Sequence, residues 1–242
     1  MMKMEPKQFE YKGDKGVSVL SRWLAIAAGL VMLFFSGCLG GVEGQHLESR
    51  NGFAVISSPE KGEAIATFAG GCFWAMQECM VELKGVNKVI SGYAGGTTEH
   101  PSYTQVSSKN TGHAESVQVY YDPKVITFEQ LVKVFFYAHD PTELNRQGPD
   151  VGTDYRSIAF FRSPEEYHII TKVMREVQGE ITGKMPVVTE VLPFRVIYPA
   201  ETEHQDYYKR HQLDTYIRNV SKPKVEKLKK VMPALIKPEY QG

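Results

Sequence analysis

Residues 64–80 constrain what this chain can fold into more than any other stretch of it. They read AIATFAGGCFWAMQECM, in which a short apolar run meets two adjacent glycines, a cysteine and two aromatic residues. A short apolar run that ends at paired glycines is typical of a buried strand followed by a tight turn. After the turn, residues from Phe73 to Met80 follow the spacing of one helical face, which predicts a helix that Cys72 opens.

Cys72 is the candidate reactive residue. A cysteine in the first turn of a helix lies near the positive end of the helix dipole and near unpaired backbone amides, and both favour the nucleophilic thiolate. The alternative is a small buried core residue, which is the role of most lone cysteines. Paired glycines that admit a ligand, and the large side chains of Phe73 and Trp74, favour a functional site.

Five short motifs follow one another in order along the chain. They are GCFWA at 71–75, SGYAGG at 91–96, HPSY at 100–103, GHAE at 112–115 and HDPTELNRQGPDVGTDYRS at 139–157. Together they resemble the A-type peptide-methionine sulfoxide reductases, over residues 64–214. Enzymes of this family convert methionine sulfoxide back to methionine. The resemblance implies reduction of the S epimer, free or in oxidised proteins, with no bound cofactor and with a thioredoxin-type protein or a small dithiol as reductant.

Reduction of a sulfoxide by a thiol needs a nucleophile, a proton donor for the departing oxygen and a pocket for the methyl group. Cys72 is the candidate nucleophile, and its attack leaves a sulfenic acid. Phe73 and Trp74 are candidates for the methyl pocket, where apolar burial discriminates by about 1–3 kcal/mol. Glu115 is the candidate acid, because burial at the start of a strand raises a carboxyl pKa. The alternative for Glu115 is a surface carboxylate.

The resemblance adds further residues to this site. It implies that Tyr103 and Tyr155 hydrogen-bond the sulfoxide oxygen and that Asp150 supports the site from a polar loop. Because tyrosine is often a core residue, a packing role is the alternative for the two tyrosines. Among the histidines, His204 is expected near the pocket, whereas His113 and His139 are expected to be structural.

The remaining patterns predict an α+β fold. Expected strands cover residues 86–93, 115–121 and 157–161, and capping patterns start helices at Thr127 and Ser163. The order strand, helix, strand, strand, helix, strand predicts a two-layer split βαβ (ferredoxin-like) core with extra helices and a long C-terminal extension. The family resemblance implies the same core. Residues 187–198 are expected as an edge strand or a hairpin, because their prolines exclude a central strand.

Residues 1–38 resemble a bacterial lipoprotein signal peptide. Basic residues precede the apolar run 23–35, which is shorter than the roughly 20 residues of a membrane span. The sequence Phe-Ser-Gly-Cys that ends at Cys38 then resembles a lipoprotein cleavage box. This predicts lipidation of Cys38 and an exported enzyme anchored to the membrane in the cell envelope. An ordinary signal peptide and an uncleaved anchor are the alternatives.

Three further segments complete the expected organisation. Residues 39–62, rich in Gly, Ser, Glu and Gln, are expected as a flexible tether, and residues 63–218 as the catalytic domain, with a helix over 203–216. Residues 219–242 are expected as a lysine-rich extension. Its apolar stripe either packs on the domain or meets an anionic membrane surface.

Composition and cysteine usage limit the partners. With 28 basic and 28 acidic side chains the formal charge is zero, so nothing global favours nucleic acid. Cys38, Cys72 and Cys79 form no C-x-x-C pair and have no zinc spacing, so no metal is expected. Along one helix, Cys79 lies roughly 10 Å from Cys72, beyond the about 7 Å that a disulfide tolerates. An external thiol is therefore expected to reduce the sulfenic acid directly.

Two other functions remain open from the sequence. A cysteine hydrolase would pair Cys72 with a distant histidine and an orienting Asn or Asp. A lipoprotein that binds without turnover would need only the pocket and the tether. The aromatic pair beside the sulfur suits a methyl pocket better than an oxyanion hole, and the five ordered motifs favour the reductase.

Overall fold

A six-stranded sheet forms the central layer of the computed structural model, which describes residues 45–241. In sheet order its strands are β10 (Ile197–Pro199), β4 (Val86–Ala94), β5 (Ala114–Tyr121), β3 (Ala64–Gly70), β8 (Ser157–Phe161) and β9 (Glu190–Pro193). Neighbouring strands run antiparallel, except β8 and β9, which are parallel. All the strands expected from the sequence before residue 187 are present.

The four inner strands and two helices confirm the predicted split βαβ core. In chain order the elements are β3, α2 (Phe73–Val81), β4, β5, α4 (Phe128–Ala138) and β8. Their sheet order β4-β5-β3-β8 places β5 and β3 in the centre, so the two halves of the core interleave. This is the ferredoxin-like arrangement of an α+β fold.

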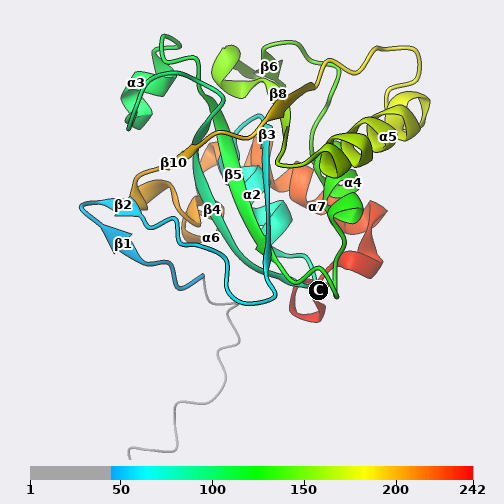
Figure 1. The fold of residues 1–242 in the computed structure, drawn as a ribbon. Helices are drawn as coiled ribbons and strands as arrows, with labels where there is room; N and C mark the ends of the chain where they lie inside the picture. The colour runs from blue at the N-terminus through cyan, green and yellow to red at the C-terminus, as the bar shows by residue number, and fades with distance from the viewer. Residues whose placement is uncertain (1–44, 242) are drawn as a thin grey trace, which may run out of the picture. The chain divides into compact units, whose positions relative to one another are not determined.

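Helices cover one face of the sheet (Figure 1). Helices α2 and α4 pack on the inner strands, α5 (Pro164–Glu180) packs on α4 and β8, and α7 (Lys222–Val231) packs on α2 and α4. Phe68, Met80 and Phe135 are fully buried there, and the rings of Phe68 and Phe135 stack with centroids 5.0 Å apart. Full burial of such a side chain contributes about 1.5–3 kcal/mol, so this face holds the principal core.

An N-terminal hairpin precedes the core. Strands β1 (Ser49–Arg50) and β2 (Phe53–Ala54) pair antiparallel, and the turn between them is Asn51-Gly52. Both turn residues have positive φ, 52° and 82°. Two-residue hairpin turns of this kind favour an Asn-Gly pair, because both positions adopt left-handed conformations.

We call residues 45–58 the N-terminal strap. Ala54 of the strap is buried in a cluster with Ile90 and Tyr120, so the strap covers part of the sheet on β4 and β5. The prediction of a flexible tether over residues 39–62 is therefore wrong for the strap. The polar composition of this segment is typical of a linker, but a few apolar residues pack on the sheet and hold the strap in place.

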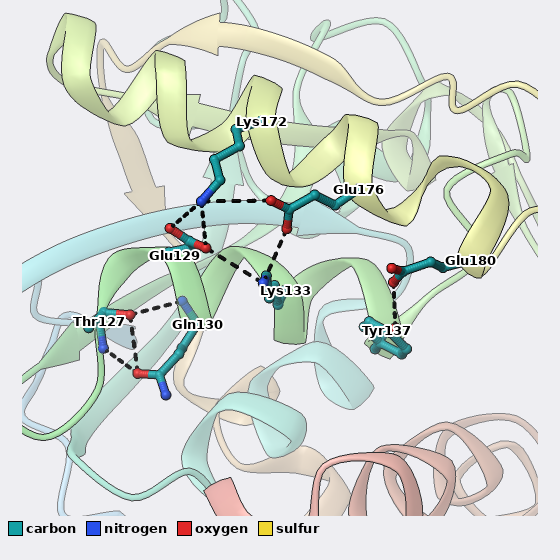
Figure 2. A network of polar contacts seen from close by, with 8 residues as sticks. All are labelled: Thr127, Glu129, Gln130, Lys133, Tyr137, Lys172, Glu176 and Glu180. Atoms are coloured by element: carbon teal, nitrogen blue, oxygen red, sulfur yellow. Dashed lines mark hydrogen bonds and ion pairs between the residues drawn. The ribbon is translucent and has the colours of Figure 1, made fainter.

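A surface network joins α4 to α5 (Figure 2). Thr127 and Gln130 form the reciprocal capping box that the sequence predicts at the start of α4. Ion pairs of 3.1 to 3.7 Å then run within and between the two helices; their members are Glu129, Lys133, Lys172 and Glu176. Exposed pairs contribute about 0–1 kcal/mol each, so the network adds little to the stability of the fold.

Residues 187–198 contribute to both edges of the sheet. Strand β9 lies at one edge and β10 at the other, so the predicted edge position is confirmed and the hairpin is wrong. Four Cα steps from Pro193 to Ile197 reach at most about 14 Å, whereas six strands spaced about 4.8 Å apart span about 24 Å when flat. The sheet must therefore curl until its two edges approach each other.

The helix predicted over residues 203–216 is interrupted. The 3-10 turn η2 covers Thr202–His204, and the helix α6 covers only Tyr207–Arg210. Asp206 between them has φ 49°, and its backbone N–H donates to Gln77 of α2 at 2.8 Å. A long-range hydrogen bond therefore replaces the local helical one at this residue.

The two ends of the chain differ in what the structure describes. In the lysine-rich C-terminal segment, Val225 and Leu228 of α7 are buried, so the apolar stripe packs on the domain. The predicted signal peptide over residues 1–38, including Cys38, lies outside the described residues. Within residues 45–241, no helix has the length and apolar content that crossing a membrane requires.

Candidate active site

Cys72 lies at the junction of β3 and α2, where the sequence predicts it. It is the N-cap residue of α2 and is 5% exposed. The preceding Gly71 has φ +81°, and a Cβ there would come within 2.4 Å of the Gln147 side chain. Only glycine tolerates both constraints. Gln147 in turn holds the backbone of Asp140 through hydrogen bonds of 2.9 and 3.0 Å, which ties the polar loop to the turn.

The Cys72 thiol keeps its proton in the resting site. Burial raises its pKa well above the ordinary value, and the charge of Glu115 adds to the effect. Hydrogen bonds to the sulfur from the Tyr216 hydroxyl and the Trp74 backbone N–H act in the opposite direction without outweighing burial. The expectation that Cys72 is a thiolate is therefore wrong. The positive end of a helix stabilises a charged group by about 0.3–2 kcal/mol, and desolvation of the thiolate costs more than that here.

Glu115 of β5 lies beside Cys72. Its Oε2 accepts a hydrogen bond from the backbone N–H of Phe73 at 3.0 Å, and the residue is 3% exposed. Burial raises the pKa of Glu115 to about 8; the Phe73 N–H opposes the shift, and the charges of Asp154 and Asp150 add to it. At neutral pH the carboxyl therefore retains a proton, as the sequence analysis expects of an acid.

An aromatic cluster surrounds the turn that carries the sulfur. Its members are Phe73, Trp74, Tyr103, His204, Tyr207 and Tyr216. Tyr103, the first residue of α3 (Tyr103–Ser107), faces His204 with ring centroids 4.2 Å apart. Trp74 stacks on Tyr207 at 3.8 Å. The structure thus brings together three of the aromatic candidates, Phe73, Trp74 and Tyr103, and the histidine expected near them.

Two ring nitrogens in this cluster lack a hydrogen-bond partner among residues 45–241. Trp74 Nε1 and His204 Nδ1 are buried and make no hydrogen bond within the part of the chain that the structure describes. Burial also lowers the pKa of His204, which keeps the ring neutral. Because an unpaired buried polar group costs free energy, these atoms suit a polar ligand group.

The polar loop brings Asp150 and Tyr155 to the same site. Asp150, in β7 (Asp150–Val151), accepts a hydrogen bond from the Tyr216 hydroxyl, which also contacts the Cys72 sulfur. Strand β7 pairs with β6 (Arg146–Gln147). Tyr155 ends the 3-10 turn η1 (Thr153–Tyr155), and burial and the charge of Glu115 raise its pKa.

The other two candidate histidines support the backbone. The His113 ring accepts from the Gly96 N–H at 3.1 Å and contacts the Thr98 carbonyl at 2.8 Å. His139 is buried between the Phe135 carbonyl and the Ser157 hydroxyl, and burial lowers its pKa to about 4. Both are structural, as expected.

Sequence reasoning missed Tyr216 and Asp154. Tyr216 lies beyond the last of the five motifs, and no local pattern connects it with Cys72. Asp154 falls inside the motif at 139–157, is 1% exposed, and its charge helps to raise the pKa of Glu115. Its place within that motif was the signal available from the sequence, whereas its burial is a property of the fold.

The arrangement combines a buried thiol, a protonated carboxyl and an aromatic wall. Among the described residues, the hydrogen bonds to the Cys72 sulfur come from Tyr216 and Trp74, and no histidine takes part. A cysteine hydrolase needs an imidazole beside its nucleophile, so the geometry does not favour that class. Residues 45–241 also contain no cluster of three or more His, Cys, Asp or Glu side chains that could hold a metal ion.

Known proteins match this chain closely. Residues 64–235 match the family model described as "Peptide methionine sulfoxide reductase". The peptide methionine sulfoxide reductase MsrA of Thermus thermophilus is 46% identical over 176 residues, which are 73% of this chain and 99% of that protein. The MsrA of Saccharolobus solfataricus is 44% identical over 173 residues, 72% of this chain and 97% of that protein.

Solved structures give the same result. Reduced Mxr1 of Saccharomyces cerevisiae superposes with a TM-score of 0.61 at 34% identity, covering 66% of this chain and 91% of that one. Methionine sulfoxide reductase A of Corynebacterium diphtheriae superposes with a TM-score of 0.59 at 33% identity, covering 64% and 78% of the two chains.

Glu115→Gln is expected to stabilise the fold at alkaline pH. Because the folded pKa is about 8 and the ordinary value is 4.5, the unfolded chain ionises first as pH rises, and the native state loses stability across that window. Glutamine still accepts from Phe73 and has no such penalty. In urea unfolding, the gain in free energy of unfolding should be larger at about pH 9 than at about pH 4, by at least about 1 kcal/mol. Equal gains would contradict a raised pKa.

Proposed function

The chain belongs to the peptide methionine sulfoxide reductase family, and on that basis we propose that Cys72 and Glu115 carry its reaction, the thiol-dependent reduction of methionine sulfoxide to methionine. The hydrogen bond from the Phe73 N–H to Glu115 supports this assignment most strongly, because it holds a protonated carboxyl beside the nucleophilic sulfur. An acid and a nucleophile are the two groups that sulfoxide reduction requires.

In the proposed step, the Cys72 sulfur attacks the sulfoxide sulfur while Glu115 donates its proton to the sulfoxide oxygen. The sulfur–oxygen bond breaks, the hydroxyl passes to Cys72, and a sulfenic acid and the methionine thioether remain. The proton that the thiol loses returns to Glu115, so no net proton is consumed. The cysteine sulfur loses two electrons and the sulfoxide sulfur gains two. Since Glu115 ionises at about pH 8, the rate falls as pH rises through that value.

The aromatic cluster suits the substrate side chain. Phe73 and Trp74 line the pocket for the methyl group, and Tyr103 and Tyr155 donate hydrogen bonds to the sulfoxide oxygen. The unpartnered Trp74 Nε1 and His204 Nδ1 support a polar ligand at this place. Asp150 acts through Tyr216, because its carboxylate accepts a hydrogen bond from the Tyr216 hydroxyl. A pocket that places the methyl group and the oxygen on different walls selects one epimer, and the family resemblance implies that this is the S epimer.

We propose that an external thiol resets the enzyme, either a thioredoxin-type protein or a small dithiol. Cys79 is 1% exposed in the interior of α2, and burial raises the pKa of its thiol. Thiol–disulfide exchange needs both thiolate and access. Cys79 offers neither unless α2 unwinds.

Cys72→Ser is expected to abolish turnover without unfolding the protein, because a hydroxyl is far less ionised and less nucleophilic than a thiol. The parent, mixed with a methionine sulfoxide peptide and dithiothreitol, should consume thiol in proportion to the methionine formed. Cys79→Ser is the matched control and should remain active. Turnover by Cys72→Ser would contradict the assignment, cleavage of esters or amides by the parent would indicate a hydrolase, and binding without turnover would indicate a binding lipoprotein.

Single turnover without reductant is expected to leave a sulfenic acid on Cys72 and a free thiol on Cys79. Thiol counting and mass spectrometry of the products measure this directly. Cys79→Ala should then turn over as fast as the parent with either dithiothreitol or a thioredoxin system. A Cys72–Cys79 disulfide, with thioredoxin-dependent turnover lost in Cys79→Ala, would show instead that α2 opens during the cycle.

We also propose that the enzyme is exported and anchored by a lipid on Cys38, because an apolar run and a Phe-Ser-Gly-Cys box precede the folded domain. Protein made in a bacterial cell should partition into the detergent phase, and Cys38→Ala should release it into the aqueous phase. Cys79→Ala controls for loss of a cysteine as such. A parent found in the aqueous phase would argue for simple secretion.

A further inference from the structure

The N-terminal strap lies outside the region that the family model matches, which begins at residue 64. Its hairpin is nevertheless paired with the segment that follows β10. Backbone hydrogen bonds of 2.7 and 3.3 Å join residues 52–54 to residues 200–202, with Phe53 opposite Glu201. The strap is therefore hydrogen-bonded to the backbone of the residues immediately before and after Glu201.

Glu201 connects this pairing to the active site. Its carboxylate accepts two hydrogen bonds of 2.8 Å, one from the Tyr93 hydroxyl and one from the backbone N–H of Tyr103. Tyr103 is the first residue of α3, which Ser102 and Gln105 cap, so the second bond ties the backbone of the residue that carries the ring to Glu201. The same ring packs on His204 inside the aromatic cluster.

A second anchor ties the strap to the helix of Cys72. Gln45 accepts from the Val89 N–H at 2.6 Å and donates to the Asp206 carboxylate at 2.7 Å. Gln77 of α2 contacts the same two residues, donating to the Val89 carbonyl at 2.9 Å and accepting from the Asp206 N–H at 2.8 Å. The strap and α2 therefore share one hydrogen-bond network around the segment that carries Glu201.

We propose that the N-terminal strap is a positioning element of the active site, which acts through Glu201 to place the Tyr103 hydroxyl relative to Cys72. The inference rests on the proposed function, in which that hydroxyl hydrogen-bonds the sulfoxide oxygen. A misplacement of 1 Å at a reacting group costs up to about 100-fold in rate. A strap that only stabilised the fold would instead lower the melting temperature and leave the contribution of the Tyr103 hydroxyl unchanged.

A double-mutant cycle in the full-length chain separates the two roles. Leucine at position 201 has no acceptor atom in its side chain, so Glu201→Leu loses both hydrogen bonds. We expect Glu201→Leu to lower kcat/KM about 10-fold in the parent and less than about 2-fold in Tyr103→Phe, because contacting residues of one network are not additive. Tyr103→Phe alone should lower kcat/KM at least about 10-fold, as loss of a positioned transition-state donor does.

A matched pair of glycine substitutions tests the strap itself. Gly52 and Gly62 both have positive φ, and a Cβ at either meets no atom within 4 Å. A β-branched residue is strained at both positions, but only Gly52 lies in the segment paired with residues 200–202. Gly52→Val should lower kcat/KM about 10-fold and couple to Tyr103→Phe in the same way, whereas Gly62→Val should stay within about 2-fold of the parent.

Each outcome decides the proposal. Coupled losses in the Glu201 and Gly52 variants support it. Equal losses with and without the Tyr103 hydroxyl, or no loss on Tyr103→Phe, overturn it. If Gly52→Val does not fold, as judged by thermal unfolding, the Glu201 cycle alone decides. A parent that lacks sulfoxide reductase activity overturns the proposed function, a result distinct from an active parent with additive variants.

Discussion

The active site depends on one hydrogen bond between the first amide of α2 and the carboxyl of Glu115. That bond joins a helix start to a central strand of the sheet, and it is possible because β3, which leads into α2, is the neighbour of β5. Gly70 and Gly71 connect β3 to α2 through a single tight turn. The carboxyl holds its proton because the fold buries it, and the Phe73 N–H opposes that shift without cancelling it.

The core of the fold follows from local pattern. Apolar runs bounded by turns locate β3, β4, β5 and β8, and the capping box at Thr127 and Gln130 locates the start of α4. These features depend on neighbours in the chain, which is why the order of elements predicts the split βαβ core. Cys72 and Glu115 meet for the same reason, since Cys72 follows β3 and Glu115 lies at the start of the neighbouring strand β5.

What the sequence does not reveal depends on contacts between distant segments. The raised pKa of Cys72 follows from burial in the folded chain, and Tyr216, whose hydroxyl donates to the sulfur and opposes the shift, lies far from Cys72 in the sequence. Strands β9 and β10 separate to opposite edges because the sheet curls, a property of all six strands together. The N-terminal strap resembles a linker in composition, and only its Asn51-Gly52 turn hints at a hairpin.

The protonated, 5% exposed state of Cys72 has a consequence for the conditions in which such an enzyme works. Methionine sulfoxide accumulates where peroxides are abundant, and peroxides oxidise accessible thiolates, first to sulfenic and then to irreversible acids. A thiol that keeps its proton and is buried in the fold is a poor target for that chemistry. The burial that weakens the resting nucleophile therefore protects the repair enzyme from the oxidants whose damage it reverses.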